Sequence, residues 1–398
     1  MIILSLVKIG LVGKPNVGKS TLFSAITESD VEVANYPFTT IKPNVGVALF
    51  KTRCPEVEIG VKCSPREGRC VNGTRYVPVE VIDVPGLIPG ASEGKGMGNE
   101  FLDNIRDSDA IIHVFDSSGT TSLEGTPSGE EITDPLEEIA FVRAELIKWM
   151  SSKLSKDWEK FARKVESRKD KPERLIVKKV ASFGLGERDV AEILLKEEFP
   201  SKLSHWNEEF FTRFAESVFR YVKPLIHIGN KADIAKKETL DRIREKYPET
   251  FFISAEYELA IRKAKAAGFI NSIGADFELS PKCSEKQKEA LNMMRGFFGG
   301  SGIDRIEDVV EQLVRKTLGY IVVFPVYDES HWTDKDGNVL PDAFLVRKGE
   351  NALNLAFRVH TEIGEGFIRA IDCRKKMVVS KDHELNDGDV IRIVSKTK

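Results

Sequence analysis

Cysteines are few in this sequence, and long apolar runs are absent. Five cysteines in 398 residues are too few for a disulfide framework. No stretch reaches the roughly 18 apolar residues that a membrane helix needs. The apolar start MIILSLVKIGLVG is interrupted by Lys8 and has no small-residue cleavage site, so it predicts a buried strand rather than a signal peptide. We therefore expect a soluble cytoplasmic protein without a membrane partner.

An excess of charge of one sign is also missing. The chain has 59 Lys and Arg against 62 Asp and Glu, a net charge of −3. This balance excludes a uniformly basic nucleic-acid-binding protein, and we expect no DNA partner. Positive charge is concentrated locally, since residues 153–179 hold eleven Lys and Arg against five Asp and Glu. A solvated helix face is the simplest interpretation of that segment, with an RNA-contacting surface as the alternative.

The chain divides into segments that differ in composition and apolar pattern. Five short apolar runs rich in β-branched residues alternate with helical or loop segments, which predicts a parallel α/β sheet. These expected strands are Val7–Val12, Val79–Val84, Ala110–Phe115, Leu225–Ile228 and Thr250–Ile253. Two stretches, 135–222 and 256–318, have helical patterns instead, and the second is broken by FFGGSG (297–302). From Tyr320 onward, five strand patterns and one amphipathic helix predict a small α+β domain.

We accordingly expect four parts. The α/β domain would comprise 1–134 and 223–256, interrupted by a helical insertion at 135–222. A helical extension would occupy 257–319, and the C-terminal domain 320–398.

A phosphate-binding motif follows the first expected strand. GKPNVGKS (13–20) fits GxxxxGK[ST] and lies between a strand ending at Val12 and a helix beginning near Lys19, as the motif requires. Backbone N–H groups of such a loop surround phosphates at the positive end of a helix. Lys19 would bridge the outer phosphates, and Ser20 would bind Mg²⁺. The residues expected to bind nucleotide here are Gly13, Lys14, Pro15, Asn16, Val17, Gly18, Lys19, Ser20 and Thr21.

Two further motifs favour a switch around the γ-phosphate. DVPG (83–86) ends a buried strand, so Asp83 could hold Mg²⁺ through water and the Gly86 N–H could meet the γ-phosphate. Thr40 in YPFTTIKP lies after the first helix, where a mobile loop would bring its hydroxyl to Mg²⁺. Thr39 is the alternative for that role.

NKAD (230–233) predicts guanine recognition. Asp233 can accept hydrogen bonds from guanine N1–H and from the exocyclic amine, while Asn230 and Lys231 would brace the loop and the base. Adenine does not offer those donors in that arrangement, and an unpaired buried carboxylate would cost several kcal/mol.

SAE (254–256) follows the next strand and completes the base site. Its residues are Ser254, Ala255 and Glu256, and the Ala255 N–H would meet the guanine oxygen. NKAD or SAE alone carries little weight. Together, in this order and at the carboxyl ends of strands where open α/β sheets bind ligands, the motifs indicate a GTPase that binds GTP and GDP.

The motifs resemble those of the Obg class of translation-factor-related GTPases. NYPFTTIKPNVG (35–46) is similar to the first switch of that class, and DVPGLIPGASEGKGMGNEFLDNIRDSDAIIHV (83–114) to its Gly-rich second switch and the following strand. The order of parts is similar to the YchF-like subfamily. LVRKGENALNLAFRVHTEIGEGFIRAID with ELNDGDVIRIV resembles the TGS domain, a ubiquitin-like β-grasp module.

The resemblance implies a fold and a function. The fold would be an α/β P-loop NTPase with a Ras-like, mostly parallel G domain, helical insertions and a C-terminal α+β TGS domain. The function would be slow GTP hydrolysis as a conformational switch, with the ribosome or ribosomal RNA as partner. YchF-like members with a degenerate fourth box can prefer ATP, but NKAD is intact here, so we expect GTP. An ATPase of the same architecture, a metabolic P-loop kinase and a binding module with negligible turnover stay open as alternatives.

The resemblance also bears on catalysis, for which we single out Lys19, Asn16, Thr40 and Gly86. Ras-like proteins position the attacking water with a Gln after DxxG. Leu87 stands there in this sequence and has no polar group. Related GTPases with a hydrophobic residue at that position use an Asn in the phosphate loop to help bind K⁺, which adds K⁺ at Asn16 to the expected cofactor Mg²⁺. The alternative is that Asn16 only shapes the loop.

Two further sets of residues are given ordinary roles. Cys54, Cys63 and Cys70 have the spacing C-x8-C-x6-C, which is not a zinc-ribbon pattern, and no fourth ligand is evident. Free thiols on an excursion of the chain are favoured over a metal site or a disulfide. His113 on the apolar strand AIIHVFD is interpreted as a core or strand-end histidine rather than a catalytic one.

Overall fold

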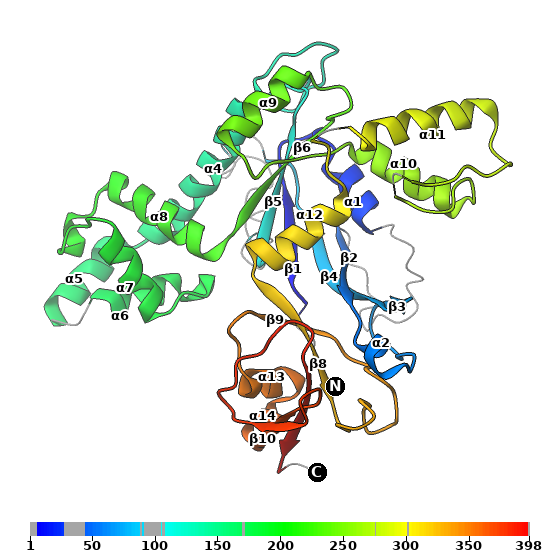
Figure 1. Cartoon of the computed structure of the whole chain (residues 1–398). Helices are drawn as coiled ribbons and strands as arrows, with labels where there is room; N and C mark the ends of the chain where they lie inside the picture. The colour runs from blue at the N-terminus through cyan, green and yellow to red at the C-terminus, as the bar shows by residue number, and fades with distance from the viewer. Residues whose placement is uncertain are drawn as a thin grey trace.

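The computed structural model describes residues 6–27, 44–87, 90, 105, 108–168, 172–274, 276–300 and 302–396. A sheet lies at the centre, with a group of helices extending from one side and a helical pair from the other (Figure 1). A second, separate sheet forms the C-terminal domain below it. Among the helices in these ranges, none has the length and apolar character needed to cross a membrane.

The central sheet is mostly parallel. Its strands are β1 (Lys8–Val12), β2 (Val45–Arg53), β3 (Arg69–Val71), β4 (Thr74–Asp83), β5 (Ala110–Asp116), β6 (Leu225–Asn230) and β7 (Phe251–Phe252). Their order is β2-β4-β1-β5-β6-β7, with β3 also paired to β4. From β4 to β7 every pair is parallel, so these five strands end at the same edge. All seven residues of β5 are buried, as expected for a strand covered on both faces.

The sequence patterns did not predict β2 and β3. Both strands run antiparallel to β4, and β2 pairs with it from Val45↔Ile82 to Arg53↔Thr74. The segment before DVPG therefore extends the sheet, where the sequence indicated only an excursion. The reason is that β2 reads VGVALFKTR, with exposed Lys51 and Arg53 interrupting its apolar run.

Helices cover the sheet and extend beyond it. Outside the β5–β6 connection and the C-terminal domain they include α1 (Lys19–Thr27), α9 (Lys237–Lys246), α10 (Ala255–Ala266), α11 (Glu285–Phe298) and α12 (Ile306–Gln312), of which α10 and α11 form the helical pair that extends from the sheet (Figure 1). α10 packs against α1, and α12 packs against β2 and continues into a π-helical turn, Leu313–Thr317. The break between α11 and α12 falls in the Gly-rich FFGGSG stretch.

The helices between β5 and β6 form what we call the arm. They are α4 (Pro135–Ser155), α5 (Trp158–Arg168), α6 (Pro172–Val180), α7 (Glu187–Lys196) and α8 (Glu208–Val222). Asp134 caps α4 and Asn207 caps α8, each by accepting a backbone N–H. Trp158 and Trp206 stack with their ring centroids 5.0 Å apart in the core of the arm. One apolar cluster joins these side chains to the central sheet through Leu87 and α4.

The C-terminal domain is a β-grasp. It contains β8 (Tyr320–Val326), β9 (Phe344–Arg347), α13 (Ala352–Val359), α14 (Thr361–Glu365), β10 (Phe367–Asp372), β11 (Met377–Val379) and β12 (Val390–Ser395). The strand order is β11-β10-β12-β8-β9, with β12 and β8 parallel and the other pairs antiparallel. The expected five strands are present. The single expected helix is divided at His360, whose extended backbone separates α13 from α14.

Candidate nucleotide-binding site

The phosphate loop turns tightly between β1 and α1. Asn16 and Gly18 have φ angles of 61° and 92°, in the left-handed region. A Cβ on Gly18 would lie 2.2 Å from Nδ2 of Asn230, so a larger residue does not fit there. Nζ of Lys19 lies inside the loop and donates to the carbonyls of Gly13 (3.0 Å) and Lys14 (2.9 Å). Burial lowers the pKa of Lys19 to about 8, although the negative charges of Asp83 and Glu138 act in the opposite direction.

The structure brings two of the predicted magnesium ligands together. Oγ of Ser20, at the start of α1, donates to Oδ2 of Asp83 at the end of β4 (2.8 Å). The other carboxylate oxygen, Oδ1 of Asp83, is buried and has no hydrogen-bond partner among the described residues. A hydroxyl beside an unsatisfied carboxylate oxygen suits a hard cation such as Mg²⁺. Thr40 and its alternative Thr39 lie outside the described residues.

The residues after Asp83 lie directly against the phosphate loop. A Cβ on Gly86 would come within 2.9 Å of Cγ of Pro15, so this close approach depends on glycine. The N–H of Leu87 donates to the carbonyl of Gly13 (3.0 Å). The Leu87 side chain is only 2% exposed and belongs to the apolar cluster that continues into the arm. The side chain at this position therefore supplies packing and no polar atom to the site.

Asn230 and Lys231 hold the loops around the predicted base site. Nδ2 of Asn230 donates to the carbonyl of Val17 (2.7 Å), which ties the end of β6 to the phosphate loop. Lys231 has a φ of 61°, and its Nζ contacts Oδ2 of Asp116 (2.7 Å) and Oγ1 of Thr121 (2.9 Å). Asp233 is half-buried and forms no hydrogen bond or ion pair within the described parts of the chain. Its carboxylate is thus available to a ligand.

The N–H of Ala255 has a partner that the sequence did not predict. It donates to Oδ1 of Asn230 (2.8 Å), so a hydrogen bond to the guanine oxygen requires this contact to be exchanged. Ser254 caps α10 by accepting the N–H of Tyr257 (3.3 Å), and Glu256 is exposed in the first turn. The three SAE residues therefore position the start of α10 beside NKAD.

Asp116 is a site residue that the sequence analysis missed. It ends β5 and accepts hydrogen bonds from Ser118, Thr121 and Lys231. Burial alone would raise the pKa of Asp116, but these donors outweigh it and lower the pKa below its usual value. A signal was available, because Asp116 ends a fully buried strand at the same edge as DVPG and NKAD.

A buried ion pair also connects the phosphate loop to the arm. Nζ of Lys14 lies 2.9 Å from Oε2 of Glu138 on α4 and donates to the carbonyl of Thr121 (2.6 Å). Burial raises the pKa of Glu138 to about 7 against the opposing charge of Lys14. No local pattern could identify Glu138, since it comes from the first turn of a helix assigned to another part of the chain.

Asn16 braces a neighbouring loop in this structure. Its Nδ2 donates to the carbonyl of Gly125 (2.8 Å), in the segment between β5 and α4. The loop-shaping alternative for Asn16 therefore has a visible contact, and Oδ1 is the atom that stays available for an ion.

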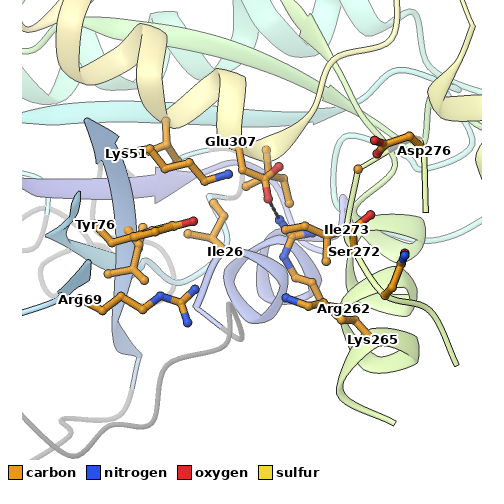
Figure 2. Close-up of a pocket in the computed structure, with 16 residues that line it drawn as sticks. Ile26, Lys51, Arg69, Tyr76, Arg262, Lys265, Ser272, Ile273, Asp276 and Glu307 are labelled. Carbon is orange, nitrogen blue, oxygen red and sulfur yellow. Dashed lines mark hydrogen bonds and ion pairs between the residues drawn. The ribbon is translucent and has the colours of Figure 1, made fainter. Parts of the chain in front are cut away.

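A separate cavity of about 290 Å³ opens between the β2–β4 pair and helices α10 and α12. Figure 2 shows Lys51 and Tyr76 on the strand side of it, and Arg262 opposite. Nη2 of Arg262 is paired there with Oε1 of Glu307 (2.7 Å). None of the nucleotide residues predicted from the sequence lines this cavity, so it is distinct from the nucleotide site.

Comparisons with known proteins show the family to which the chain belongs. Residues 8–157 match a family model described as 50S ribosome-binding GTPase, 228–328 match the G4 motif-containing domain of YGR210-like Obg-like GTPases, and 331–395 match the TGS domain. A GTP-binding protein of Methanocaldococcus jannaschii is 44% identical over 98% of this chain and 99% of its own length. The chain belongs to the YchF-like, Obg-class GTPase family. The ribosome-binding ATPase YchF of Bacillus subtilis is 28% identical to it over 96% of this chain and 97% of that protein.

The fold of this YchF-like protein is found in a solved relative. The crystal structure of a GTP-binding protein from Pyrococcus horikoshii OT3 superposes with a TM-score of 0.76 at 36% identity, covering 98% of this chain and 99% of that one. The expected architecture is confirmed as a P-loop G domain with a C-terminal TGS domain, and the chain is a nucleotide hydrolase by family. The TGS family model begins at residue 331, but β8 (Tyr320–Val326) already pairs with β9 and β12 of the TGS sheet.

Proposed function

We propose that this YchF-like protein binds GTP with Mg²⁺ and hydrolyses it slowly, as a conformational switch that associates with the ribosome in the cytoplasm. The observation that carries the proposal is that the carboxylate of Asp233 is available to a ligand. Asp233 forms no hydrogen bond or ion pair with the described residues. The neighbouring Asn230 and Lys231 are held in place by four hydrogen bonds and ion contacts. The two carboxylate oxygens of Asp233 suit the two donors of guanine, N1–H and the exocyclic amine.

The preference for GTP over ATP follows from the cost of mismatching Asp233. Adenine has no N1–H donor, so its binding would remove water from the carboxylate without replacing those hydrogen bonds. The relative from Bacillus subtilis is named an ATPase and the one from Methanocaldococcus jannaschii a GTP-binding protein, so relatives of both kinds exist. The intact NKAD loop favours the second kind here.

Ser20 and Asp83 are the residues that we assign to Mg²⁺, with Thr40 as the proposed third ligand. The unsatisfied Oδ1 of Asp83 supports this assignment. When bound, Mg²⁺ would neutralise negative charge on the β- and γ-phosphates. Lys19 would add a second positive charge within the loop, after exchanging its present carbonyl partners for phosphate oxygens.

Slow hydrolysis is supported by Leu87. Its buried aliphatic side chain cannot orient the attacking water in the way that a Gln does. Gly86 is the residue whose N–H we assign to the γ-phosphate. A shift of the chain at Gly86 on phosphate release would carry Leu87 with it, and Leu87 packs in the same cluster as Val142 and Leu146 of α4. We therefore expect the arm to be the first part of the molecule whose position changes on phosphate release.

The ribosome is the proposed partner because of the family model's description and the names of the YchF relatives. Exposed lysines on the arm and on the TGS domain give both appendages positive charge for ribosomal RNA. Competition titrations with GTP, GDP and ATP test the nucleotide part of the proposal. We expect GTP and GDP to bind at least about tenfold more tightly than ATP. Equal affinity for ATP would overturn the guanine assignment and favour the ATPase alternative.

A further inference from the structure

Three cysteines and one glutamate meet in a single cluster, in the segment between the first-switch motif (35–46) and DVPG (83–86). The ligand atoms of Cys54, Glu56, Cys63 and Cys70 all lie within 4.8 Å of one another. Sγ of Cys54 and Sγ of Cys63 are 3.7 Å apart, and Sγ of Cys70 donates to Oε1 of Glu56 at 3.1 Å. The sequence alone does not reveal the fourth donor, because Glu56 is separated from Cys54 by only one residue and matches no ribbon spacing.

The spacing of these atoms suits a tetrahedral ion. Zinc–sulfur bonds of about 2.3 Å place two thiolates of one tetrahedron roughly 3.8 Å apart, close to the Cys54–Cys63 separation. All three thiols are free in the structure. A disulfide between Cys54 and Cys63 would need sulfur atoms about 2.05 Å apart and would leave Cys70 unpaired.

The backbone already holds the four donors in place. The N–H of Cys54, next to the end of β2, donates to the carbonyl of Gly73 (2.8 Å), which closes the segment 54–73 on itself. Glu56 opens the single-turn helix α2 (Glu56–Ile59), and its carboxylate accepts N–H groups from Cys63 (2.7 Å) and Gly73 (3.1 Å). Cys70 lies on β3. A carboxylate has about four acceptor sites, so these bonds leave room for an ion.

The segment 54–73 contains little apolar material to fold around. No residue of α2 is buried, whereas Cys54 is completely buried and Cys63 is 8% exposed. Small units without a sufficient core commonly depend on metal ligands for stability. The cysteines are therefore the centre of this segment, rather than incidental residues in it.

A buried positive charge lies next to the cluster. Arg75 on β4 is 1% exposed, and its Nη1 lies 3.7 Å from Sγ of Cys63. Three thiolates and a carboxylate around a divalent ion carry a net negative charge, which a guanidinium at that distance would partly neutralise. The same guanidinium donates to the carbonyls of Leu340 (3.1 Å) and Pro341 (2.7 Å) in the TGS domain.

The segment that carries the cysteines is also the surface on which the TGS domain docks. The N–H of Ser64 donates to the carbonyl of Val339 (2.8 Å), and Nη1 of Arg66 pairs with Oδ2 of Asp342 (2.7 Å). On the other side, Nε and Nη2 of Arg374 form two bonds with Glu58 (2.7 and 2.8 Å). Fixing the fold of 54–73 therefore fixes the position of the TGS domain on the G domain.

We propose that Cys54, Glu56, Cys63 and Cys70 bind one structural Zn²⁺ ion that orders the docking surface of the TGS domain. Four protein ligands close the coordination sphere, which is the mark of a structural rather than a catalytic zinc site. The site shares no residue with the nucleotide site, so it stands whether the chain prefers GTP or ATP.

Elemental analysis of the purified full-length chain tests the proposal directly. Protein prepared with zinc and reductant, then gel-filtered, should retain about one zinc per chain. Cys63→Ser and Cys70→Ser should each lose most of it. The matched control is Cys283→Ser, which removes a buried thiol from the separate cluster between α10 and α11. Zinc below about a tenth of an equivalent, or retention by Cys63→Ser equal to the unmutated chain, would overturn the site.

Two measurements on folded protein remove the possibility that a variant simply misfolds. Zinc should be removable from the unmutated chain by a chelator, and its return should raise the thermal unfolding midpoint, because the ion binds the native state selectively. Cobalt(II) in its place should give the intense thiolate-to-metal absorption and the visible bands of tetrahedral coordination. An unchanged midpoint together with a six-coordinate cobalt spectrum would contradict the proposal.

The role of Glu56 is tested by Glu56→Gln. Competition with a chromophoric chelator should show zinc bound at least about tenfold more weakly, while affinity for GTP stays unchanged. Equal zinc affinity would refute the four-ligand set. Peptide mapping that found a Cys54–Cys63 disulfide in protein purified under reductant would refute the metal site itself.

Discussion

Lys14 occupies the middle of the phosphate loop, yet its side chain points away from the phosphate position into the protein. Its ammonium group is completely buried between the carbonyl of Thr121 and the carboxylate of Glu138. When one partner of such a pair is removed, the other charge is left in a medium of low dielectric constant. Lys14 thus determines how tightly the phosphate loop is held to α4.

We expect Lys14→Met to lower the free energy of unfolding by about 3 kcal/mol, because Glu138 loses its counter-charge. The double variant Lys14→Met with Glu138→Leu should recover most of that loss. Denaturant unfolding of the two single variants and the double variant forms a double-mutant cycle. Additive losses would show that the two side chains do not interact.

We propose that Asp233 determines which base is bound. Asp233→Asn reverses the hydrogen-bond polarity at one position and should shift the preference from guanine toward xanthine nucleotides. Binding of GTP should weaken by at least about tenfold, and binding of XTP should strengthen. Titration with both nucleotides measures the change. A parallel loss for both would indicate damage to the loop instead.

Asn16 offers a test of K⁺ in turnover. If Oδ1 of Asn16 helps to bind K⁺, hydrolysis should be faster in KCl than in NaCl of equal ionic strength, by at least about threefold, since an added positive charge near the bridging oxygen accelerates related enzymes by ~10³–10⁵. Asn16→Ala should remove the difference. Asn16→Asp keeps an oxygen but loses the donor to Gly125, so it should retain the difference. Equal rates of the unmutated enzyme in the two salts would exclude the cation.

At the scale of elements, β5 and β6 share a buried histidine pair. His113 and His227 are in register on these parallel strands, with their Nδ1 atoms 3.1 Å apart. Burial lowers the pKa of His113 well below its usual value, and the nearby His227 lowers it further. Burial also lowers the pKa of His227 to about 4, and the positive charge of Arg143 acts in the same direction. This agrees with the interpretation of His113 as a core residue.

The pair should make stability depend on pH. The unfolded histidines titrate near 6.5, so below that pH the unfolded state binds more protons than the folded state and the free energy of unfolding falls. We expect a progressive loss between about pH 6.5 and pH 4, measured by denaturant unfolding at several pH values. His227→Phe should reduce the slope. The same slope in the variant and the unmutated protein would exclude the pair as its source.

The elements that could be predicted are those whose sequences are uninterrupted apolar runs or complete motifs. β1, β4, β5 and β6 were predicted because buried parallel strands are apolar on both faces, and the site motifs because they end those strands. β2 was not predicted because exposed Lys51 and Arg53 interrupt its apolar run. Glu138 was not predicted because only the packing of α4 against β5 brings it to Lys14. Glu56 was not predicted because its proximity to the three cysteines depends on the fold of 54–73.

At the scale of the whole molecule, positive charge lies on the two appendages. Lys153, Lys160 and Lys164 are exposed on the arm, and Lys376 and Lys381 on the TGS domain. Arg374 of the TGS domain is also basic, but it contacts Glu58 at the domain interface. The TGS surface that we propose for RNA is therefore smaller than the number of basic residues in the domain suggests.

We expect the chain to cosediment with ribosomes in a GTP-dependent manner that weakens steeply from low to physiological salt, because phosphate contacts release counterions. Deletion of 320–398 should reduce binding. The charge-reversal pair Lys376→Glu and Lys381→Glu should do so without exposing the docking surface. Lys286→Glu on α11 is the matched control, also exposed but outside both appendages. Ribosome binding that does not depend on nucleotide, salt, the deletion or the charge reversals would contradict the ribosome proposal. It would leave the nucleotide assignment intact.

The contact between Asn230 and Val17 joins residues 213 positions apart, and the whole arm is inserted between them. During synthesis the phosphate loop therefore leaves the ribosome long before the strand that clamps it. The arm consists of local helical contacts and can form within that interval, whereas the clamp must wait for β6 and the start of α10. Nucleotide would thus be captured only late in biogenesis, when about two thirds of the chain has been made, and its binding marks the completion of the G domain's folding.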